Sequence, residues 1–369
     1  MSTTSLSKTL VVKNGLLLLA FHLPRLFGII YLVIIGLWIK KGYQETDIGT
    51  GTVFTKVIGF ADTTHRTDLE NASRKVWDAL DVVGEAQDDQ SLFIMTNEIS
   101  TIGQKRSVCP EDISVAEAHC TLKNRSMCVK GDSILLKGHG IMTGNCVPFP
   151  NSTNHTCEIQ GWCPAEHSVF KTPALLPEAL NFKILLKAFV RFPKFDKGVS
   201  NTKADVTDEE LISNCKENAT NYWDCPIFNV SYILNEAGIN DTRRDKIILQ
   251  GGIIAVTIKW ICDFDSDRDG KRCLPDYTFK QLKKETHNNH SVWYFRSVRY
   301  DSDKGVQTRD LFRKTGLFFI FNIDAKAGRY DTFTTLLSFG AITGYFRLSN
   351  PEPDSNPVSN PDPVPDPYF

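Results

Sequence analysis

The residues best suited to chemistry are ten cysteines, all between positions 109 and 273. An even number of closely spaced cysteines is typical of a disulfide framework formed in an oxidising compartment. No pair has the two-residue gap of a zinc ribbon or a thioredoxin-like site, which argues against a zinc module. Spacing alone leaves about 945 pairings open. The cysteines are Cys109, Cys120, Cys128, Cys146, Cys157, Cys163, Cys215, Cys225, Cys262 and Cys273.

Glycosylation sequons recur beside these cysteines. An Asn-x-Ser/Thr pattern arises by chance and some copies go unused, but their concentration in one region indicates lumenal or extracellular exposure. The candidate sites are Asn71, Asn124, Asn151, Asn154, Asn218, Asn229, Asn240 and Asn289.

Catalytic and metal-binding signatures are weak by comparison. The sequence lacks a Gly-x-Ser-x-Gly elbow, a His-Glu-x-x-His motif and a phosphate-binding Gly-rich loop, which argues against a secreted or membrane-anchored hydrolase. His287 and His290 are close together, but a surface loop explains them more simply than a metal site. Asp265–Gly270 matches the Asp-x-Asp-x-Asp-Gly start of a calcium-binding loop. At the twelfth position, however, Asp276 stands where such loops usually have a bidentate glutamate. We therefore expect no resident metal and a solvated hairpin tip.

Two apolar segments are candidates for membrane spans. Leu16–Ile39 would cover about 36 Å as a helix, with Pro24-Arg25 interrupting it and Leu26–Ile39 as its core. A cleaved signal peptide is the competing interpretation, but no small-residue cleavage site follows the apolar run. The sequons then orient the chain, with residues 1–15 cytoplasmic, a first span over 16–40 and an extracellular region after it.

The second apolar segment, Thr332–Phe346, would cover only about 22 Å as a helix, less than the ~30 Å hydrocarbon core. Its small and hydroxyl residues suit helix packing or a pore lining, and a buried soluble segment is the alternative. Residues 331–346 form the predicted shortened pore helix. The Pro-rich residues 347–369 cannot bury a core and predict a disordered tail.

The region between the two segments is predicted to be mostly β. Strand-like runs occur at Ser91–Met95, Ile253–Trp260, Val292–Arg296 and Gly316–Phe321. A helix is expected after Thr207, which is placed to cap it, with Glu210 at the third position. The net charge of −1 gives no reason to expect a nucleic-acid partner.

Short motifs along this region resemble the ATP-gated P2X receptor channels. The resemblance covers about residues 25–345, and the cysteines follow the family's order. Its motifs are Lys41–Asp47, Val76–Asp78, Ser91–Asn97, Cys157–Pro164, Asn181–Phe182, Cys225–Phe228, Glu236–Gly238, Gly251–Ile253, Cys273–Pro275 and Lys326–Asp331.

The resemblance implies a homotrimeric, ATP-gated, cation-permeable channel rather than an enzyme. It implies a plasma-membrane, multi-pass protein in contact with the lipid bilayer, with a disulfide-rich, β-sandwich-like extracellular domain at 41–330. No cofactor is expected, ATP is the ligand, and modulation by divalent cations is left open.

The resemblance also implies a ligand site between subunits. Lys56, Lys183, Arg296 and Arg313 would bind the triphosphate, which needs several basic groups. Adenine and ribose contacts would come from Leu185 and Tyr294, with Ile212 and Ile227 supplied by the neighbouring subunit. On the sequence alone, each of these basic residues could equally be a solvated surface group.

This chain departs from the family pattern at its ligand site. Ile58 stands where a second phosphate-binding lysine is expected, Tyr294 replaces an asparagine, and Lys183 replaces a threonine that contacts the base. A lysine stem reaches about 6 Å, so we expect Lys183 to compensate for Ile58.

The second segment would line the pore with Leu337, Ser338, Ala341 and Gly344, which recur at helical spacing. Because this segment is short, we expect weak or absent current. The alternative is a non-conducting, ATP-binding or dominant-negative subunit.

The resemblance finally selects one disulfide pattern. The expected pairs are Cys109–Cys163, Cys120–Cys146, Cys128–Cys157, Cys215–Cys225 and Cys262–Cys273. The first three would make residues 109–163 a compact head lobe with little need of its own apolar core.

Overall fold

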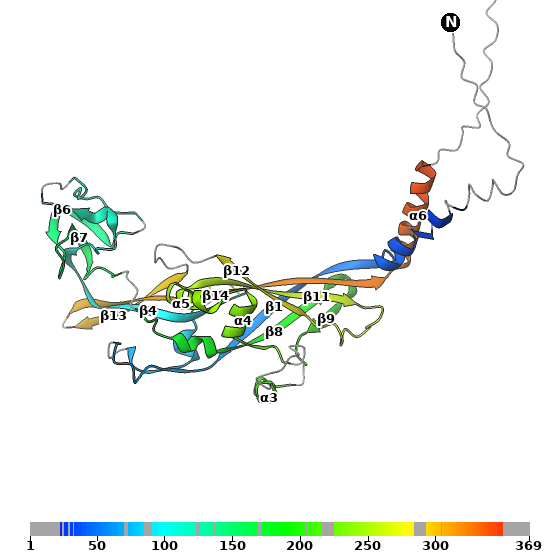
Figure 1. The fold of residues 1–369 in the computed structure, drawn as a ribbon, viewed down its shortest axis with the longest axis horizontal. Coiled ribbons are helices and arrows are strands. Elements are labelled where there is room, and N and C mark those ends of the chain that lie inside the picture. The colour runs from blue at the N-terminus through cyan, green and yellow to red at the C-terminus, as the bar shows by residue number, and fades with distance from the viewer. Residues whose placement is uncertain are drawn as a thin grey trace, which may run out of the picture. The chain divides into compact units, whose positions relative to one another are not determined.

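The structure is a computed structural model (Figure 1). It describes residues 23, 26–28, 30–31, 33–69, 73–84, 90–122, 126–135, 137–167, 172–203, 206–215, 225–283, 293–303 and 305–349. Its strands are β1 (Gln44–Ile58), β2 (Ala61–Asp62), β3 (Val76–Trp77), β4 (Ser91–Pro110), β5 (His119–Cys120), β6 (Gly140–Pro148), β7 (His155–Cys163), β8 (Lys183–Phe192), β9 (Lys197–Ser200), β10 (Ile227–Asn229), β11 (Gly252–Asp263), β12 (Asp276–Lys283), β13 (Tyr294–Asp303) and β14 (Val306–Tyr330). Its helices are α2 (Ala79–Val82), α3 (Asp208–Asn214), α4 (Val230–Glu236), α5 (Asp241–Gln250) and α6 (Thr332–Ser349), and a π-helical turn at Ile34–Ile39 precedes β1.

Twelve strands of the described part form one sheet, with the order β10-β8-β1-β14-β4-β7-β5 along its main path. Off that path, β11 pairs with β12 and β14, β13 with β14, β6 with β7, and β9 with β8. The longest strands, β4 and β14, are antiparallel, with register partners from Thr308 and Lys105 to Ile320 and Ser91. The prediction of a mostly β chain is confirmed.

Alternating burial explains why the central strands form. Along β8, Ile184, Leu186 and Val190 are fully buried, whereas Phe189 is 47% exposed. Residues two apart on a strand face the same side, so one face of β8 packs into the core and the other meets its surroundings. The same strand can therefore serve both the core and a surface site.

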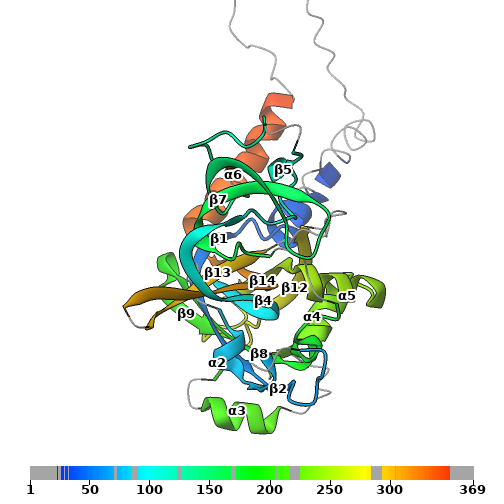
Figure 2. The ribbon, with the colours of Figure 1, turned by 90° about the vertical axis from the view of Figure 1, so that its left-hand side faces the viewer.

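Helices α4 and α5 lie side by side in both ribbon views (Figure 2). Their buried residues include Ile233 and Leu234 from α4 and Ile247 from α5. Next to α4, the Phe228 ring meets the rings of Tyr277 and Phe279 edge-on, with centroids 4.9 and 5.5 Å away. This aromatic packing fixes β10 and α4 against β12.

The described chain divides into two compact units. One consists of Met1–Asp47, Asp263–Asp269 and Ala327–Phe369, and the other of Ile48–Cys262 and Gly270–Lys326. All the expected ligand contacts belong to the second unit, and all the expected pore residues belong to the first.

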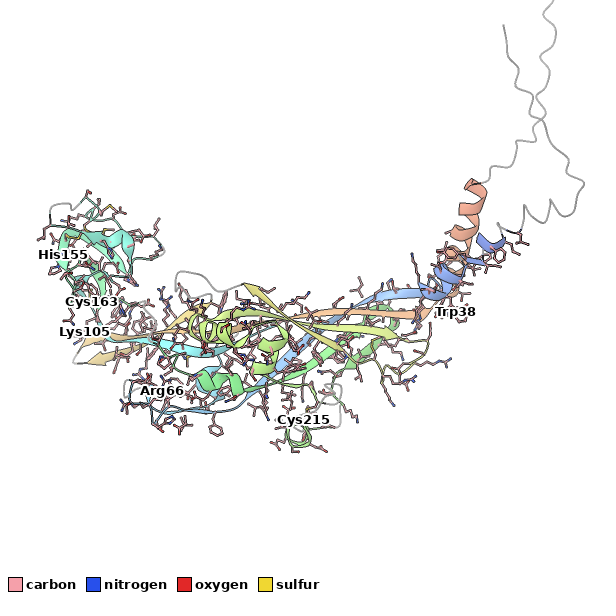
Figure 3. The ribbon with its side chains drawn as sticks, in the orientation of Figure 1. Trp38, Arg66, Lys105, His155, Cys163 and Cys215 are labelled. Carbon is pink, nitrogen blue, oxygen red and sulfur yellow. A yellow bond between two sulfur atoms is a disulfide. The ribbon has the colours of Figure 1, made fainter. Side chains whose placement is uncertain are left out.

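Three disulfides stabilise the head lobe. At the base of the lobe β4 pairs with β7, and Lys105 lies opposite Cys163 (Figure 3). The lobe's small buried core consists of Cys128, Cys146 and Cys157 together with Met142 and Ile159. The bridges thus supply much of the packing that an apolar core would otherwise provide.

The five disulfides are the pairs that the resemblance implies. Cys109–Cys163, Cys120–Cys146 and Cys128–Cys157 lie in the head lobe, and Cys215–Cys225 and Cys262–Cys273 lie outside it. The described residues contain no free cysteine.

Several local predictions are confirmed. The helix after Thr207 forms as α3, and the Thr207 hydroxyl accepts a hydrogen bond of 3.2 Å from the Glu210 backbone amide. The Asp265 segment lies in the turn between β11 and β12, where the Asp265 carboxylate accepts hydrogen bonds from Gln44 and from the Tyr330 backbone. The second apolar segment is helical, as α6.

The predicted spans and domain boundaries stay predictions. Helix α6 continues to Ser349, past its predicted end at Phe346. Among the residues described here, no helix is both long and apolar enough to cross a membrane.

Gly316 allows a close approach of β14 to β4. A Cβ added there would lie 2.0 Å from the backbone oxygen of Ile94, at a register irregularity between β4 and β14. We predict that Gly316→Ala forces these strands apart and costs about 1–3 kcal/mol or more of unfolding free energy. The measurement is thermal unfolding of the purified protein, together with the fraction that reaches the cell surface.

Gly252→Ala on β11 is the matched control. Its added Cβ would come no closer than 3.4 Å to any atom, an ordinary contact with Ile247. If both variants unfold at the wild-type temperature, the strand pairing around Gly316 is not as described.

Candidate ligand-binding site

Two predicted site residues come together where β1 pairs with β8. The register sets Lys56 opposite Leu185, and Ile58 opposite Lys183. Residues directly opposed in antiparallel strands have Cβ atoms about 4.5–5.5 Å apart, and positions two apart share a face. These four residues therefore form one patch. The Lys56 side chain is 56% exposed, whereas Leu185 is buried.

Strand β10 extends the patch. Ile227 lies opposite Leu185, and Asn229 lies opposite Lys183. Leu185 is only 1% exposed, whereas Ile227 is half-buried. Ile227 is therefore the more accessible apolar contact for a ligand on this face.

Several of the expected contacts come together within one chain. Ile227 pairs with Leu185 inside one chain, and Asp208 at the start of α3 forms an ion pair with Lys56 of that same chain. Ile212 follows one helical turn later in α3. One chain thus brings α3 and Ile227 to the patch that holds Leu185, because strand register and helix placement, which sequence motifs do not reveal, decide these neighbours.

The two predicted arginines form a second pair. Arg296 on β13 lies directly opposite Arg313 on β14. The Tyr294 ring lies beside both, with its centroid 5.5 Å from the guanidinium carbon of Arg296 and 4.2 Å from that of Arg313. Such cation–π contacts are attractive, so the tyrosine at this position holds the arginines together.

A buried carboxylate balances these arginines. The Glu166 side chain is 2% exposed; its Oε2 lies 2.8 Å from Arg296 Nε, and its Oε1 lies 3.8 Å from Arg313 Nη1. Burial lowers the pKa of Arg313, and the Glu166 charge acts in the opposite direction. A guanidinium stays charged in proteins, so Arg313 is a buried cation beside Glu166.

The loop that carries Glu166 is held at its start by two contacts. It follows Cys163, which is bonded to Cys109, and the Gln104 amide donates a 2.6 Å hydrogen bond to the Pro164 carbonyl. The disulfide at the base of the head lobe therefore positions the counterion of the arginine pair.

The head lobe adds a histidine to this cluster. His139 Nε2 lies 3.7 Å from Glu166 Oε2, and His139 Nδ1 contacts Glu111, whose side chain is 1% exposed. Glu111 also accepts the His139 backbone amide at 2.8 Å. Two buried carboxylates thus flank one imidazole beside the arginine pair.

Lys314, next to Arg313 in sequence, faces the other way. Its register partner is Glu98, and both line a cavity of about 510 Å³ together with Trp77 and Phe312. Burial raises the pKa of Glu98, while Lys314 opposes this shift. Lys314 is therefore separate from the arginine pair.

The expected pore residues do not all share one environment. The Ser338 hydroxyl donates a 2.7 Å hydrogen bond to the Gly42 carbonyl of the same chain, whereas Leu337 is 57% exposed. Ala341 is exposed and Gly344 is partly exposed. Ser338 thus contacts the chain just after the first apolar segment, and Leu337, Ala341 and Gly344 keep the helical spacing of one face.

The structure describes some of the candidate glycosylation sites. Asn151, Asn154 and Asn240 are exposed, and Asn229 is half-buried. Asn71, Asn124, Asn218 and Asn289 lie outside the described residues, as do His287 and His290.

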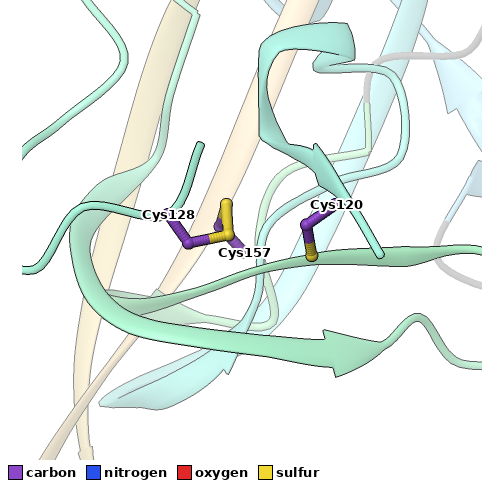
Figure 4. Close-up of side chains that lie close together, drawn as sticks. All are labelled: Cys120, Cys128 and Cys157. Atoms are coloured by element: carbon purple, nitrogen blue, oxygen red, sulfur yellow. A yellow bond between two sulfur atoms is a disulfide. The ribbon is translucent and has the colours of Figure 1, made fainter. Parts of the chain in front are cut away.

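A group with metal-ligand spacing occurs among the cysteines. The sulfur atoms of Cys120, Cys128 and Cys157 lie within 4.8 Å of one another (Figure 4). All three form disulfides: Cys120 is bonded to Cys146, and Cys128 is bonded to Cys157. A disulfide sulfur is no thiolate, so this group would not hold a metal ion.

Comparison with known proteins decides the family. Residues 3–350 match the family model described as ATP P2X receptor. The chain belongs to the P2X receptor family. It is 34% identical to mouse P2X purinoceptor 5 over 338 residues, which cover 91% of this chain and 71% of that protein. It is 36% identical to mouse P2X purinoceptor 4 over 311 residues, covering 82% and 75%.

Solved P2X structures share the fold. The chicken ATP-gated P2X7 receptor channel, determined with the competitive antagonist TNP-ATP, matches with a TM-score of 0.73 and 30% identity, covering 88% of this chain and 95% of that one. A P2X receptor from the Gulf Coast tick, determined with ATP and Zn²⁺, gives 0.73 and 29%, covering 88% and 97%.

Family membership fixes the general class. P2X receptors are ligand-gated ion channels rather than enzymes, so the prediction that the chain is not an enzyme is confirmed. The family consists of trimeric plasma-membrane channels with a large extracellular domain.

Sequence reasoning missed three residues at the candidate site. Glu166 balances the arginines, and Asp208 forms ion pairs with Lys56 and Lys187. Lys187 could have been found, because it is two residues beyond Leu185 on the same strand. The two carboxylates carry no sequence signature.

Removing the Glu166 charge tests the arginine cluster. Breaking a buried ion pair from one side costs about 3–5 kcal/mol, because the remaining charge stays buried without its partner. Glu166→Gln should therefore lower the unfolding temperature of the purified receptor by several degrees. Glu117→Gln is the control, because Glu117 forms an exposed ion pair with Lys137 in the head lobe and such pairs contribute little. Equal stability of the two variants would contradict the buried cluster.

Proposed function

We propose that this chain forms a trimeric, cation-permeable channel that extracellular ATP opens by binding between subunits. Family membership supports the channel class. The arrangement of basic side chains on β1, β8, β13 and β14 supports a polyphosphate ligand.

One observation carries the assignment of ATP to this particular chain. Lys183 lies directly opposite Ile58 on the neighbouring strand. The P2X pattern has a lysine at position 58, and the nearest side chain on the same face supplies one instead. A four-carbon stem with a mobile ammonium can reach the phosphates from there. The positive charge of the site is thereby kept although its position has moved.

The four cations fall into two pairs. Lys56 and Lys183 lie on β1 and β8, and Arg296 and Arg313 lie on β13 and β14. In our proposal, the lysine pair of one subunit and the arginine pair of the next bind the triphosphate together. The base then rests near Leu185 and Ile227, and Tyr294 borders the ribose and phosphates.

The membrane part of the proposal follows the two apolar segments. Residues 16–40 and 331–346 are the proposed spans, 41–330 are extracellular, and 1–15 and the tail at 347–369 are cytoplasmic. Leu337, Ala341 and Gly344 line the proposed pore. Ser338 contributes by holding α6 to the chain at Gly42.

Recording current from cells that express the unaltered chain tests the function. ATP should evoke a small inward cation current, because the proposed pore segment is short, and Arg296→Ala should abolish it while surface expression is kept. ATP binding without current would favour the alternative of a non-conducting subunit. Absence of both would overturn the proposal.

A double-mutant cycle tests the compensation by Lys183. Lys183→Thr should weaken ATP binding roughly tenfold to a hundredfold, because a charge-assisted hydrogen bond contributes about 1.5–3 kcal/mol. Ile58→Lys should restore much of the affinity in that background. The measurement is equilibrium ATP binding to the purified trimer.

Lys259→Thr on β11 is the control for the charge change, because Lys259 is an exposed lysine outside the site. Unchanged affinity in Lys183→Thr would show that the remaining cations suffice and that Lys183 plays no part.

A further inference from the structure

One carboxylate forms ion pairs with two lysines on the patch where β1 pairs with β8. Asp208 Oδ2 lies 3.8 Å from Lys56 Nζ, and Asp208 Oδ1 forms a close ion pair with Lys187 Nζ. Lys56 comes from β1, Lys187 from β8, and Asp208 from the first position of α3. Two strands and a helix thus meet at a single acid.

Lys187 belongs to the same patch as the expected phosphate ligands. Lys183, Leu185 and Lys187 are two residues apart along β8 and share one face. Lys56 is opposite Leu185, and Phe54 is opposite Lys187, so Lys187 and Lys56 are diagonal neighbours. The patch therefore gathers three lysines.

Three ammonium groups on one face repel one another. Asp208 offsets part of this charge, and the hydrogen bond from Lys187 is the main reason that the pKa of Asp208 lies below its usual value. The carboxylate is consequently ionised at neutral pH.

This counterion is easily exchanged. The side chains of Lys56, Lys187 and Asp208 are 56%, 33% and 36% exposed. Ion pairs that meet water contribute little net stability. Glu166 differs, because its side chain is 2% exposed beside the arginines. An incoming anion can displace Asp208 at low cost, but not Glu166.

We propose that Asp208 is the resident counterion of the lysine patch, which a polyphosphate ligand displaces, and that it thereby sets the affinity for that ligand. The proposal rests on the proposed function, since it presumes that the phosphates reach Lys56 and Lys187. Asp208 and the phosphates compete for the same ammonium groups. The affinity cost imposed by Asp208 therefore grows with the negative charge of the ligand.

The test measures binding of ATP, ADP and AMP to the purified full-length trimer. Asp208→Asn should tighten ATP binding roughly three- to tenfold, with a smaller gain for ADP and the smallest for AMP. Asp208→Glu keeps the charge and should bind ATP nearly as the wild type does. Lys187→Gln should weaken ATP binding and abolish the gain from Asp208→Asn in the double variant.

Glu209→Gln is the matched control, because it removes the same charge from an exposed position in the same helical turn. A similar gain in Glu209→Gln would show that net charge alone is responsible and would overturn the proposal. So would unchanged or weaker ATP binding in Asp208→Asn when the wild type binds ATP. If the wild type and all variants bind no ATP, the proposed function itself fails.

Discussion

The repulsion between two arginines directly opposite each other on β13 and β14 is the constraint on which the site depends. Arg296 and Arg313 can share that position because Glu166 lies between them, buried, and Tyr294 stacks beside both. Glu166 in turn depends on the Cys109–Cys163 disulfide and on Gln104. The disulfide framework of the head lobe therefore supports the candidate ligand site as well as substituting for an apolar core.

The lysine side of the site follows a different principle. On β8, alternate residues enter the core, so Ile184 and Leu186 fix the strand while Lys183 and Lys187 share the opposite face. Lys187 and Lys56 are partly exposed, and their shared counterion is the partly exposed Asp208. The arginine pair thus has a buried counterion and the lysines have an accessible one, an arrangement suited to a ligand that must bind and leave.

Local features were predictable from the sequence. The strand at Ile253–Trp260 and the Thr207 cap depend on neighbouring residues alone, and both appear as expected. The disulfide pairs required the family resemblance, because spacing leaves many pairings open. The basic site residues were also inferred from motif positions. A motif does not show which of the neighbours Arg313 and Lys314 points toward Arg296, whereas strand register does.

What the sequence did not reveal depends on register and distant packing. Glu166 meets Arg296 across 130 positions of chain, a separation for which no local pattern exists. The place of Ile227 opposite Leu185 within one chain also depends on strand pairing, which no motif shows. Asp208 looked like an ordinary first-turn acid of a helix, a position that favours carboxylates without any ligand.

The central claim is that the lysine pair of one subunit and the arginine pair of the next bind one ATP molecule. The most direct measurement is ATP binding to mixed trimers, purified through two different tags, of Lys56→Ala subunits and Arg296→Ala subunits. If the pairs act across the interface, each mixed trimer contains one interface with both pairs intact. It should then bind ATP although trimers of either variant alone do not. Mixed trimers that bind no more ATP than the single variants would contradict the account and place all four cations of a site on one chain.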